Sequence, residues 1–278
     1  MSRVLSMVDI AVMQSDEDAE RIQELGIDAD KVFSSGNLKF DVGHTGVNQT
    51  SSKELETLLG SSKRPLIVAA STHSPEEKIL LDAFRRIREP SKTEPCLLIA
   101  PRHPERFNDV ASSMAKTEFA FVRRSENRSA ADADLILLDS IGELPAAYEF
   151  ASVVFVGGSI AKKGGHNILE PAAIGSCIVT GAYTFNFASI VRKFLEEDAL
   201  VQLPPLSEAD AAAEVADVFA RLLNDPARRE KLKQKSRAVV QENIGATERT
   251  VKFIGPLLGA TNPPTQDLAP GSHSLGSA

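Results

Sequence analysis

The sequence has few cysteines and no long apolar run. Its 278 residues include two cysteines, Cys96 and Cys177, and both lie in short apolar segments typical of buried strands. We therefore expect reduced, buried thiols rather than a disulfide or a metal site. No apolar run approaches the roughly 20 residues that a membrane-spanning helix needs. Residues 1–12 do not combine a basic start with an apolar core, so we expect no signal peptide and a cytosolic protein.

Excess positive charge and the common catalytic motifs are also lacking. The formal net charge is −7, which argues against a nucleic-acid-binding protein held by bulk charge, so any phosphate recognition must be local. The sequence contains no HExxH or cysteine-rich metal pattern, no P-loop and no GxSxG motif. Neither a metal nor another cofactor is therefore predicted. With 42% hydrophobic and 25% charged residues, the composition is typical of a globular protein.

From Pro65 onward, short apolar segments alternate with helical patterns. The predicted strands cover residues 66–70, 96–100, 119–122, 135–138, 152–156, 177–180 and 199–202. Helical patterns connect them, and three more helices are predicted over 207–224, 226–243 and 246–258. Short apolar strands with helical connections predict an α/β fold with a doubly wound, mostly parallel sheet covered on both faces. Before Pro65 we expect two shorter strands, a helix capped by Ser15, a loop over 42–52 and a short amphipathic helix over 53–59.

Two glycine pairs flank a short basic connector after the predicted strand 152–156. Residues 157–159 (Gly-Gly-Ser) end this strand, and residues 164–167 (Gly-Gly-His-Asn) open a predicted helix. Glycine lets the backbone approach a ligand closely, and the free N–H groups of a helix start suit a phosphate. We interpret this stretch, with Lys162, as the phosphate cradle of a nucleotide-sugar site. Alternatively, Asn167 and Glu170 form a capping box and the glycines only mark turns.

Residues that follow the other predicted strands are further candidates, because ligands bind outside the carboxyl ends of the strands in such folds. Residues 71–72 (Ser-Thr) follow the first strand. Arg102 follows the second, where it could hold a phosphate or carboxylate, with His103 beside it as a hydrogen-bond donor. The Ile141-Gly142 pair follows the fourth strand and offers backbone groups to a nucleobase.

Two acidic motifs favour structural roles. The segment 74–77 (Ser-Pro-Glu-Glu) fits a capping box with proline at the first helical position, so we expect Glu76 and Glu77 to close a helix start. Ser140 and Glu143 fit a second box.

Several short motifs occur in a specific order along the chain. They are NLKFD (37–41), STH (71–73), PRHPERF (101–107), RRS (123–125), GELP (142–145), FVGGS (155–159), GGHNILEPAA (164–173) and TFNF (184–187). Together they closely resemble the 3-deoxy-D-manno-octulosonic acid (Kdo) transferases of lipopolysaccharide assembly, over residues 8–258. The resemblance implies a GT-B glycosyltransferase, of which this chain matches the C-terminal, Rossmann-like donor-binding half. It also implies the donor CMP-Kdo, a lipid A precursor as acceptor, and peripheral association with the cytoplasmic face of the inner membrane.

The resemblance also implies roles for individual residues. Arg102 would approach the CMP phosphate, the Ile141-Gly142 pair the cytosine, and Asn167 and Glu170 the ribose, although Ile141 stands where the family commonly has methionine. The full set expected to bind the donor is Ser71, Thr72, Pro101, Arg102, His103, Ile141, Gly142, Glu143, Gly157, Gly158, Ser159, Lys162, Gly165, His166, Asn167 and Glu170.

The family's N-terminal domain holds the membrane-associating start, the acceptor site and a catalytic glutamate, and residues 1–30 resemble only its last strand and helix. We therefore expect residues 1–52 to be a remnant of that domain with a linker, 53–258 to be the CMP-Kdo-binding domain, and 259–278 to be a disordered tail. No catalytic base is assigned, and the chain is expected to be a truncated enzyme or one half of a cleft. Two other functions fit the sequence: a nucleotide-sugar-binding module inactive by itself, and a UDP-sugar GT-B enzyme or epimerase.

Overall fold

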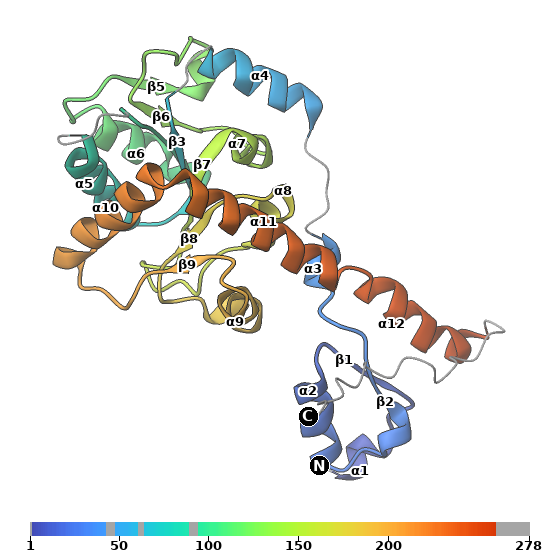
Figure 1. The fold of residues 1–278 in the computed structure, drawn as a ribbon. Coiled ribbons are helices and arrows are strands. Elements are labelled where there is room, and N and C mark those ends of the chain that lie inside the picture. Colours follow the sequence, from blue (N-terminus) through green and yellow to red (C-terminus); the bar gives the residue numbers. More distant parts are fainter. Residues whose placement is uncertain (1, 43–47, 61–63, 89–93, 260–278) are drawn as a thin grey trace, which may run out of the picture. The chain divides into compact units, whose positions relative to one another are not determined.

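The computed structural model describes residues 2–42, 48–60, 64–88 and 94–259, and the chain divides into two compact units. The larger unit is Gly43–Glu242, and the smaller unit combines Met1–Val42 with Asn243–Ala278 (Figure 1). All the residues predicted to bind a ligand belong to the larger unit.

The larger unit is built on a seven-stranded sheet in which every strand pair is parallel. The strand order is β5-β6-β4-β3-β7-β8-β9. The strands are β3 (Leu66–Thr72), β4 (Cys96–Pro101), β5 (Phe121–Arg123), β6 (Leu135–Leu137), β7 (Ala151–Val156), β8 (Ile178–Thr180) and β9 (Val201–Gln202). The predicted doubly wound, Rossmann-like parallel sheet is therefore confirmed.

Helices cover both faces of this sheet, as the continuous apolar strands require. Successive side chains of a strand point to opposite faces. Ile67 and Ala69 of β3 belong to a core shared with α5 (Glu76–Arg88), α6 (Phe107–Met114) and α10 (Glu208–Asn224). The other face contacts α7 (Leu144–Phe150), which also packs against α8 (Leu169–Ile174) and α4 (Gln49–Leu59) (Figure 1).

The remaining helices of the larger unit are α9 (Ala188–Glu196) and α11 (Pro226–Asn243), whose last residue belongs to the smaller unit. The buried Ser236 hydroxyl of α11 donates to the Ser176 carbonyl, 3.1 Å away, at the start of β8. Both cysteine thiols are free and buried, as predicted, and burial raises the pKa of each to about 12.

The order of the strands places a topological switch point between β3 and β7. After β3 the chain runs through α5 into β4, which pairs with one side of β3. Strand β7 pairs with the other side of β3, and β8 pairs with β7. The loops that follow β3 and β7 therefore diverge at one edge of the sheet, which is where ligands bind in this kind of fold.

The smaller unit contains a two-stranded parallel sheet of β1 (Ala11–Met13) and β2 (Val32–Ser34). Its helices are α1 (Ser2–Leu5), α2 (Asp16–Glu24), α3 (Lys39–Val42) and α12 (Ala246–Ile254). Ser15 caps α2 as predicted, because its hydroxyl accepts a hydrogen bond from the Asp18 N–H.

Helix α12 joins this unit through a side-chain cap supplied from α3. The Asp41 carboxylate accepts hydrogen bonds from the N–H groups of Gly245 (2.7 Å) and Thr247 (2.6 Å) at the helix start. Phe33 of β2 stacks on Phe253 of α12, with ring centroids 4.6 Å apart. The sequence-based division grouped this helix with residues 53–258, whereas in the structure it contacts the N-terminal segment.

One local prediction differs from the structure. Helix α4 begins at Gln49 rather than at the predicted residue 53, because Asn48 caps it by accepting a hydrogen bond from the Thr50 N–H. The rest of the predicted loop 42–52 lies largely outside the described residues, as does the predicted tail beyond Gly259. Among the helices that are described, none has the length and apolar character to cross a membrane.

Candidate functional site

The loops after β3 and β7 are joined by the buried carboxylate of Glu76, at the first residue of α5. One carboxylate oxygen accepts hydrogen bonds from the N–H groups of His73 (2.9 Å) and Gly158 (2.8 Å). The other accepts from the N–H groups of residues 159, 160 and 161, at 3.0, 2.9 and 3.2 Å. Burial raises the pKa of Glu76 and these N–H groups oppose the rise. Because all five partners are donors, the ionised carboxylate fits this site.

This arrangement changes the interpretation of the first glycine pair. The N–H groups of Gly158 and Ser159 donate to Glu76, so they are committed to a protein carboxylate rather than offered to a phosphate. A Cβ atom on Gly157 would lie 2.6 Å from the Ser71 carbonyl oxygen and 2.8 Å from the Glu76 carboxylate. The glycine is therefore required for the close approach of the two loops. The predicted capping role of Glu76 explains only one of its five hydrogen bonds, the one from the His73 N–H.

The second carboxylate of this helix start, Glu77, also has a role beyond capping. It is buried and binds Arg106 bidentately, with nitrogen–oxygen distances of 2.5 and 3.1 Å. The Thr72 hydroxyl donates to the same carboxylate at 2.9 Å. These bonds fix the end of β3 to the turn after β4, and the bidentate Arg106–Glu77 pair is the strong one among them. The helix itself begins at Glu76, with Pro75 preceding it after a cis peptide bond.

Three histidines meet at the switch point. The Nε2 atoms of His73 and His166 lie 2.7 Å apart, and their rings are nearly parallel, with centroids 5.0 Å apart. His103 contacts the His73 ring edge-on at 5.1 Å. The Arg102 N–H donates to the Thr72 carbonyl, which places the exposed side chains of Arg102 and His103 beside the end of β3.

Burial and the charges around these histidines disfavour their protonation. Burial, followed by the charges of His73, Arg102 and His103, lowers the pKa of His166 to about 4. Burial followed by the charge of His103 lowers the pKa of His73, although Glu77 opposes this. Both rings are therefore neutral near pH 7. Within the described residues, no group of three or more His, Cys, Asp or Glu side chains has the geometry to hold a metal ion.

The loop between β6 and α7, residues 138–143, is held at both ends by consecutive arginines from the end of β5. Arg123 binds Asp139 at 2.8 Å, and Arg124 binds Glu143 at 2.8 Å. Burial acts to raise the pKa of Asp139, but hydrogen bonds from Ser125 and Arg123 lower it below its usual range.

The Ser140 hydroxyl donates to the Glu143 carboxylate, but the second predicted capping box is wrong, because α7 begins at Leu144, its N-cap residue is Glu143 and it has no side-chain cap hydrogen bond. Between the clamped ends, Ile141 is 83% exposed and Gly142 has a φ of +87°. The β6–α7 loop thus presents one apolar side chain at its tip, supported by two ion pairs.

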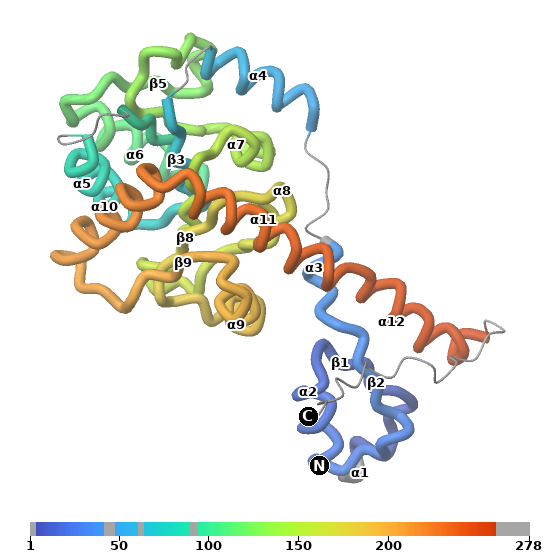
Figure 2. Tube along the Cα trace, viewed as in Figure 1, coloured from blue at the N-terminus to red at the C-terminus, as the bar shows by residue number. Residues whose placement is uncertain are grey.

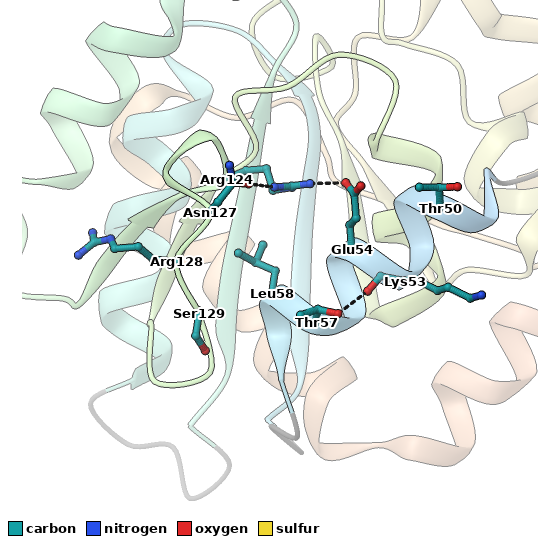
Figure 3. A pocket seen from close by; sticks show the side chains of 9 residues that line it. All are labelled: Thr50, Lys53, Glu54, Thr57, Leu58, Arg124, Asn127, Arg128 and Ser129. Carbon is teal, nitrogen blue, oxygen red and sulfur yellow. Dashed lines mark hydrogen bonds and ion pairs between the residues drawn. The ribbon is translucent and has the colours of Figure 1, made fainter.

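A cavity of about 570 Å³ lies between α4 and the segment after β5 (Figure 3). Arg124 reaches Glu54 of α4 at 2.6 Å and Asn127 at 2.6 Å within it. Lys53 and Arg128 extend away from these groups (Figure 3). The positive charges therefore do not converge, and none of the predicted donor-binding residues lines this cavity.

Asn167 and Glu170 form a local turn at the start of α8. The Asn167 side chain accepts from the Leu169 N–H at 3.0 Å and donates to the Glu170 carboxylate at 3.2 Å. These bonds do not form the predicted capping box, because the N-cap residue of α8 is Ile168 and it has no side-chain cap hydrogen bond. No described residue donates to the second Glu170 oxygen, which can therefore accept from a hydroxyl group. Lys162, in the connector between the glycine pairs, places its ammonium 5.1 Å from the centre of the Tyr183 ring.

The predicted residues end or follow four adjacent strands, β6-β4-β3-β7, at the carboxyl edge of the sheet. Strand β3, in the middle of this set, is labelled on the chain trace in Figure 2. Ser71 and Thr72 end β3, Pro101 ends β4 ahead of Arg102 and His103, and Ile141, Gly142 and Glu143 follow β6; Gly157, Gly158, Ser159, Lys162, Gly165, His166, Asn167 and Glu170 follow β7. Sequence reasoning did not select His73, Glu76, Arg106, Arg123 or Arg124 as site residues. The motifs STH, PRHPERF and RRS, which contain His73, Arg106, Arg123 and Arg124, were the signal in the sequence that could have identified them.

Comparison with known proteins identifies the family. The family model for 3-deoxy-D-manno-octulosonic-acid transferase (kdotransferase) matches residues 1–42. The chain is 36% identical to the 3-deoxy-D-manno-octulosonic acid transferase of Haemophilus influenzae, covering 91% of this chain and 58% of that protein. The Bordetella pertussis enzyme is 32% identical, covering 93% and 59%. The chain therefore spans less than two thirds of the length of these relatives.

Solved structures agree with this assignment. The C-terminal CMP-Kdo binding domain of WaaA from Acinetobacter baumannii is 34% identical, with a TM-score of 0.62, and the match covers 69% of this chain and 97% of that domain. Anabaena HepE in complex with UDP-glucose is 12% identical, with a TM-score of 0.55 over 93% of this chain and 66% of that chain, and shares the fold alone. The chain belongs to the 3-deoxy-D-manno-octulosonic acid transferase family.

Proposed function

We propose that this chain provides the donor-binding half of a glycosyltransferase that transfers Kdo from CMP-Kdo to a lipid A precursor in lipopolysaccharide core biosynthesis. The observation that carries the proposal is the convergence of the predicted residues on the switch-point edge of a unit similar to a domain named for CMP-Kdo binding. On this proposal, residues 53–258 form the donor domain and residues 1–52 belong to the preceding domain and its linker.

The proposed roles follow from the position of each group. The exposed Arg102 guanidinium binds the CMP phosphate, and the β6–α7 loop receives the cytosine against Ile141 and the Gly142 backbone. The free Glu170 oxygen accepts a ribose hydroxyl. Positive charge at the phosphate stabilises CMP as the bond to the sugar breaks.

The proposed reaction is an inverting displacement. The acceptor hydroxyl oxygen attacks the anomeric carbon of Kdo, the bond from that carbon to the phosphate oxygen breaks, and CMP leaves with the bonding electrons. A base in the other half of the cleft takes the hydroxyl proton. The acceptor is bound by that half, at the cytoplasmic face of the inner membrane.

Titration calorimetry with CMP, UMP and UDP tests the nucleotide assignment. We expect CMP to bind at least about tenfold more tightly than UMP, and a preference for UDP would instead support the UDP-sugar alternative. Arg102→Gln should weaken CMP binding by about 1.5–3 kcal/mol, the range for hydrogen bonds to charged groups. Arg86→Gln on the exposed side of α5 is the matched control and should leave CMP binding unchanged.

An activity assay with CMP-Kdo and lipid IVA tests whether this chain binds the donor while the other half of the cleft binds the acceptor. We expect transfer when the N-terminal domain of the Haemophilus influenzae relative is added, and no transfer by this chain alone. Transfer by the chain alone would show that the acceptor site lies within it.

A further inference from the structure

The His73–His166 pair has the geometry of two rings that share one hydrogen bond. Their Nε2 atoms lie 2.7 Å apart, and this contact needs one ring to donate and the other to accept. With both rings neutral, opposite tautomers satisfy it. One added proton still leaves an imidazolium that donates to a neutral ring, whereas a second would place N–H against N–H. The pair can therefore hold one extra proton without losing its hydrogen bond.

The backbone holds both rings in place from opposite sides of the switch point. The N–H groups of His73 and Gly158 donate to the same Glu76 oxygen, and the His166 N–H donates to the Gly157 carbonyl at 3.2 Å. The His166 ring lies 3.0–3.1 Å from where a Cβ on Gly158 would be. The pair is thus positioned before any ligand arrives, and it bridges the two loops that diverge at this edge.

The groups facing the pair are mainly cationic. Arg102, His103 and Lys163 act on it from the loops after β4 and β7. Arg106 also faces His73, but its charge is matched by the bidentate Glu77 carboxylate. Glu105 lies 3.7 Å from His103 and is 75% exposed. An anion among these groups would offset the positive charge that, together with burial, keeps the rings neutral.

We propose that the His73–His166 pair is a proton-linked phosphate site, which takes up one proton when a phosphate monoester binds at the switch point. This inference rests on the proposed function, because the phosphate in question is that of CMP. In the transfer reaction, the negative charge on the phosphate increases as CMP leaves, and a protonated pair would meet that charge with an N–H donor. The histidine pair supplies a second anion-binding interaction beside Arg102, in place of the glycine-loop N–H groups that already donate to Glu76.

Calorimetry in buffers of different ionisation enthalpy measures the proton uptake directly. At pH 7, we expect CMP binding to take up about 0.5–1 proton per site. Cytidine, which lacks the phosphate, should bind without uptake. His166→Gln and His73→Gln should each reduce the uptake at least twofold, whereas Arg86→Gln, the control on the exposed side of α5, should retain it.

Ring nitrogen chemical shifts of the wild-type chain provide a measurement that needs no variant. In long-range ¹H–¹⁵N spectra, we expect opposite tautomers for His73 and His166 in the free protein and one imidazolium after CMP is added. CMP binding without uptake, uptake that persists with cytidine, or uptake unaffected by both pair variants would overturn the inference and leave the proposed function standing. Failure of the wild-type chain to bind CMP, with binding of UDP, would instead overturn the proposed function.

Discussion

The Glu76 carboxylate provides the sharpest test of how the site is built. Replacing it by glutamine keeps the shape but changes one acceptor oxygen into an NH₂ donor. If the amide oxygen faces the three N–H groups of residues 159–161, the NH₂ group faces the N–H groups of His73 and Gly158. Two buried donors then lose their acceptor.

The expected loss of stability follows from that count. Each buried donor left without an acceptor costs about 1–3 kcal/mol, so Glu76→Gln should lower the free energy of unfolding by about 2–6 kcal/mol. This is a large part of the 5–15 kcal/mol typical of a folded domain. Urea denaturation followed by circular dichroism measures the change, and hydrogen exchange at residues 158–161 reports whether the loop is released.

Glu118→Gln is the matched control, because Glu118 forms a bidentate pair with Arg85 at the surface and is 53% exposed. It should leave the denaturation midpoint nearly unchanged. A loss below about 1 kcal/mol for Glu76→Gln, with hydrogen exchange at 158–161 as slow as in the wild type, would refute the anchoring role. If Glu76→Gln does not fold, Glu76→Asp, whose shorter side chain cannot reach all five donors, allows the same exchange measurement.

Three further predictions concern the neighbouring loops. Arg124→Gln should weaken CMP binding about tenfold but leave ribose 5-phosphate binding unchanged, because the β6–α7 loop loses the ion pair between Arg124 and Glu143. Calorimetry with both ligands measures this, Arg128→Gln at a side chain that is 65% exposed is the control, and equal losses for the two ligands would contradict the prediction. Gly157→Ala should destabilise the chain by about 1–3 kcal/mol or more, because its Cβ would lie 2.6 Å from a backbone oxygen; wild-type urea stability would show that the loops can separate freely. The pKa values of His73 and His166 are lowered in the folded state, so unfolding takes up protons and the free energy of unfolding should fall as the pH drops from about 6.5 toward about 4. His166→Gln should reduce the dependence of this free energy on pH between about pH 6.5 and 5, and an unchanged dependence would argue against a buried neutral ring.

Much of the fold could be predicted from the sequence, because its signals are local. The apolar segments from Leu66 onward matched all seven strands of the sheet to within a few residues, and alternation with helices predicted parallel pairing. The start of α4 was predicted late, because the cap at Asn48 lies in a polar stretch that resembles a loop. The position of α12 depends on the distant carboxylate of Asp41, which no local pattern reveals.

The edge of the sheet at which the predicted site residues gather could be predicted, but the hydrogen bonds among the loops there could not. Parallel strands bring their carboxyl ends to one edge, so the residues that follow β3, β4, β6 and β7 were expected together, and the ordered motifs indicated the Kdo transferase family. Which atoms bond to one another depends on contacts between segments far apart in the chain. Glu76 resembles a helix cap in the sequence, yet four of its five donors come from residues 158–161.

The sequence by itself therefore determined the order of elements, the edge of the sheet that carries the polar residues and the family of the chain, because each is set by short-range patterns. Only the tertiary structure decided that a carboxylate occupies the glycine-loop amides and that His73 meets His166. The physical reason is that hydrogen bonds act over about 3 Å, and folding alone brings residues more than 80 positions apart within that distance.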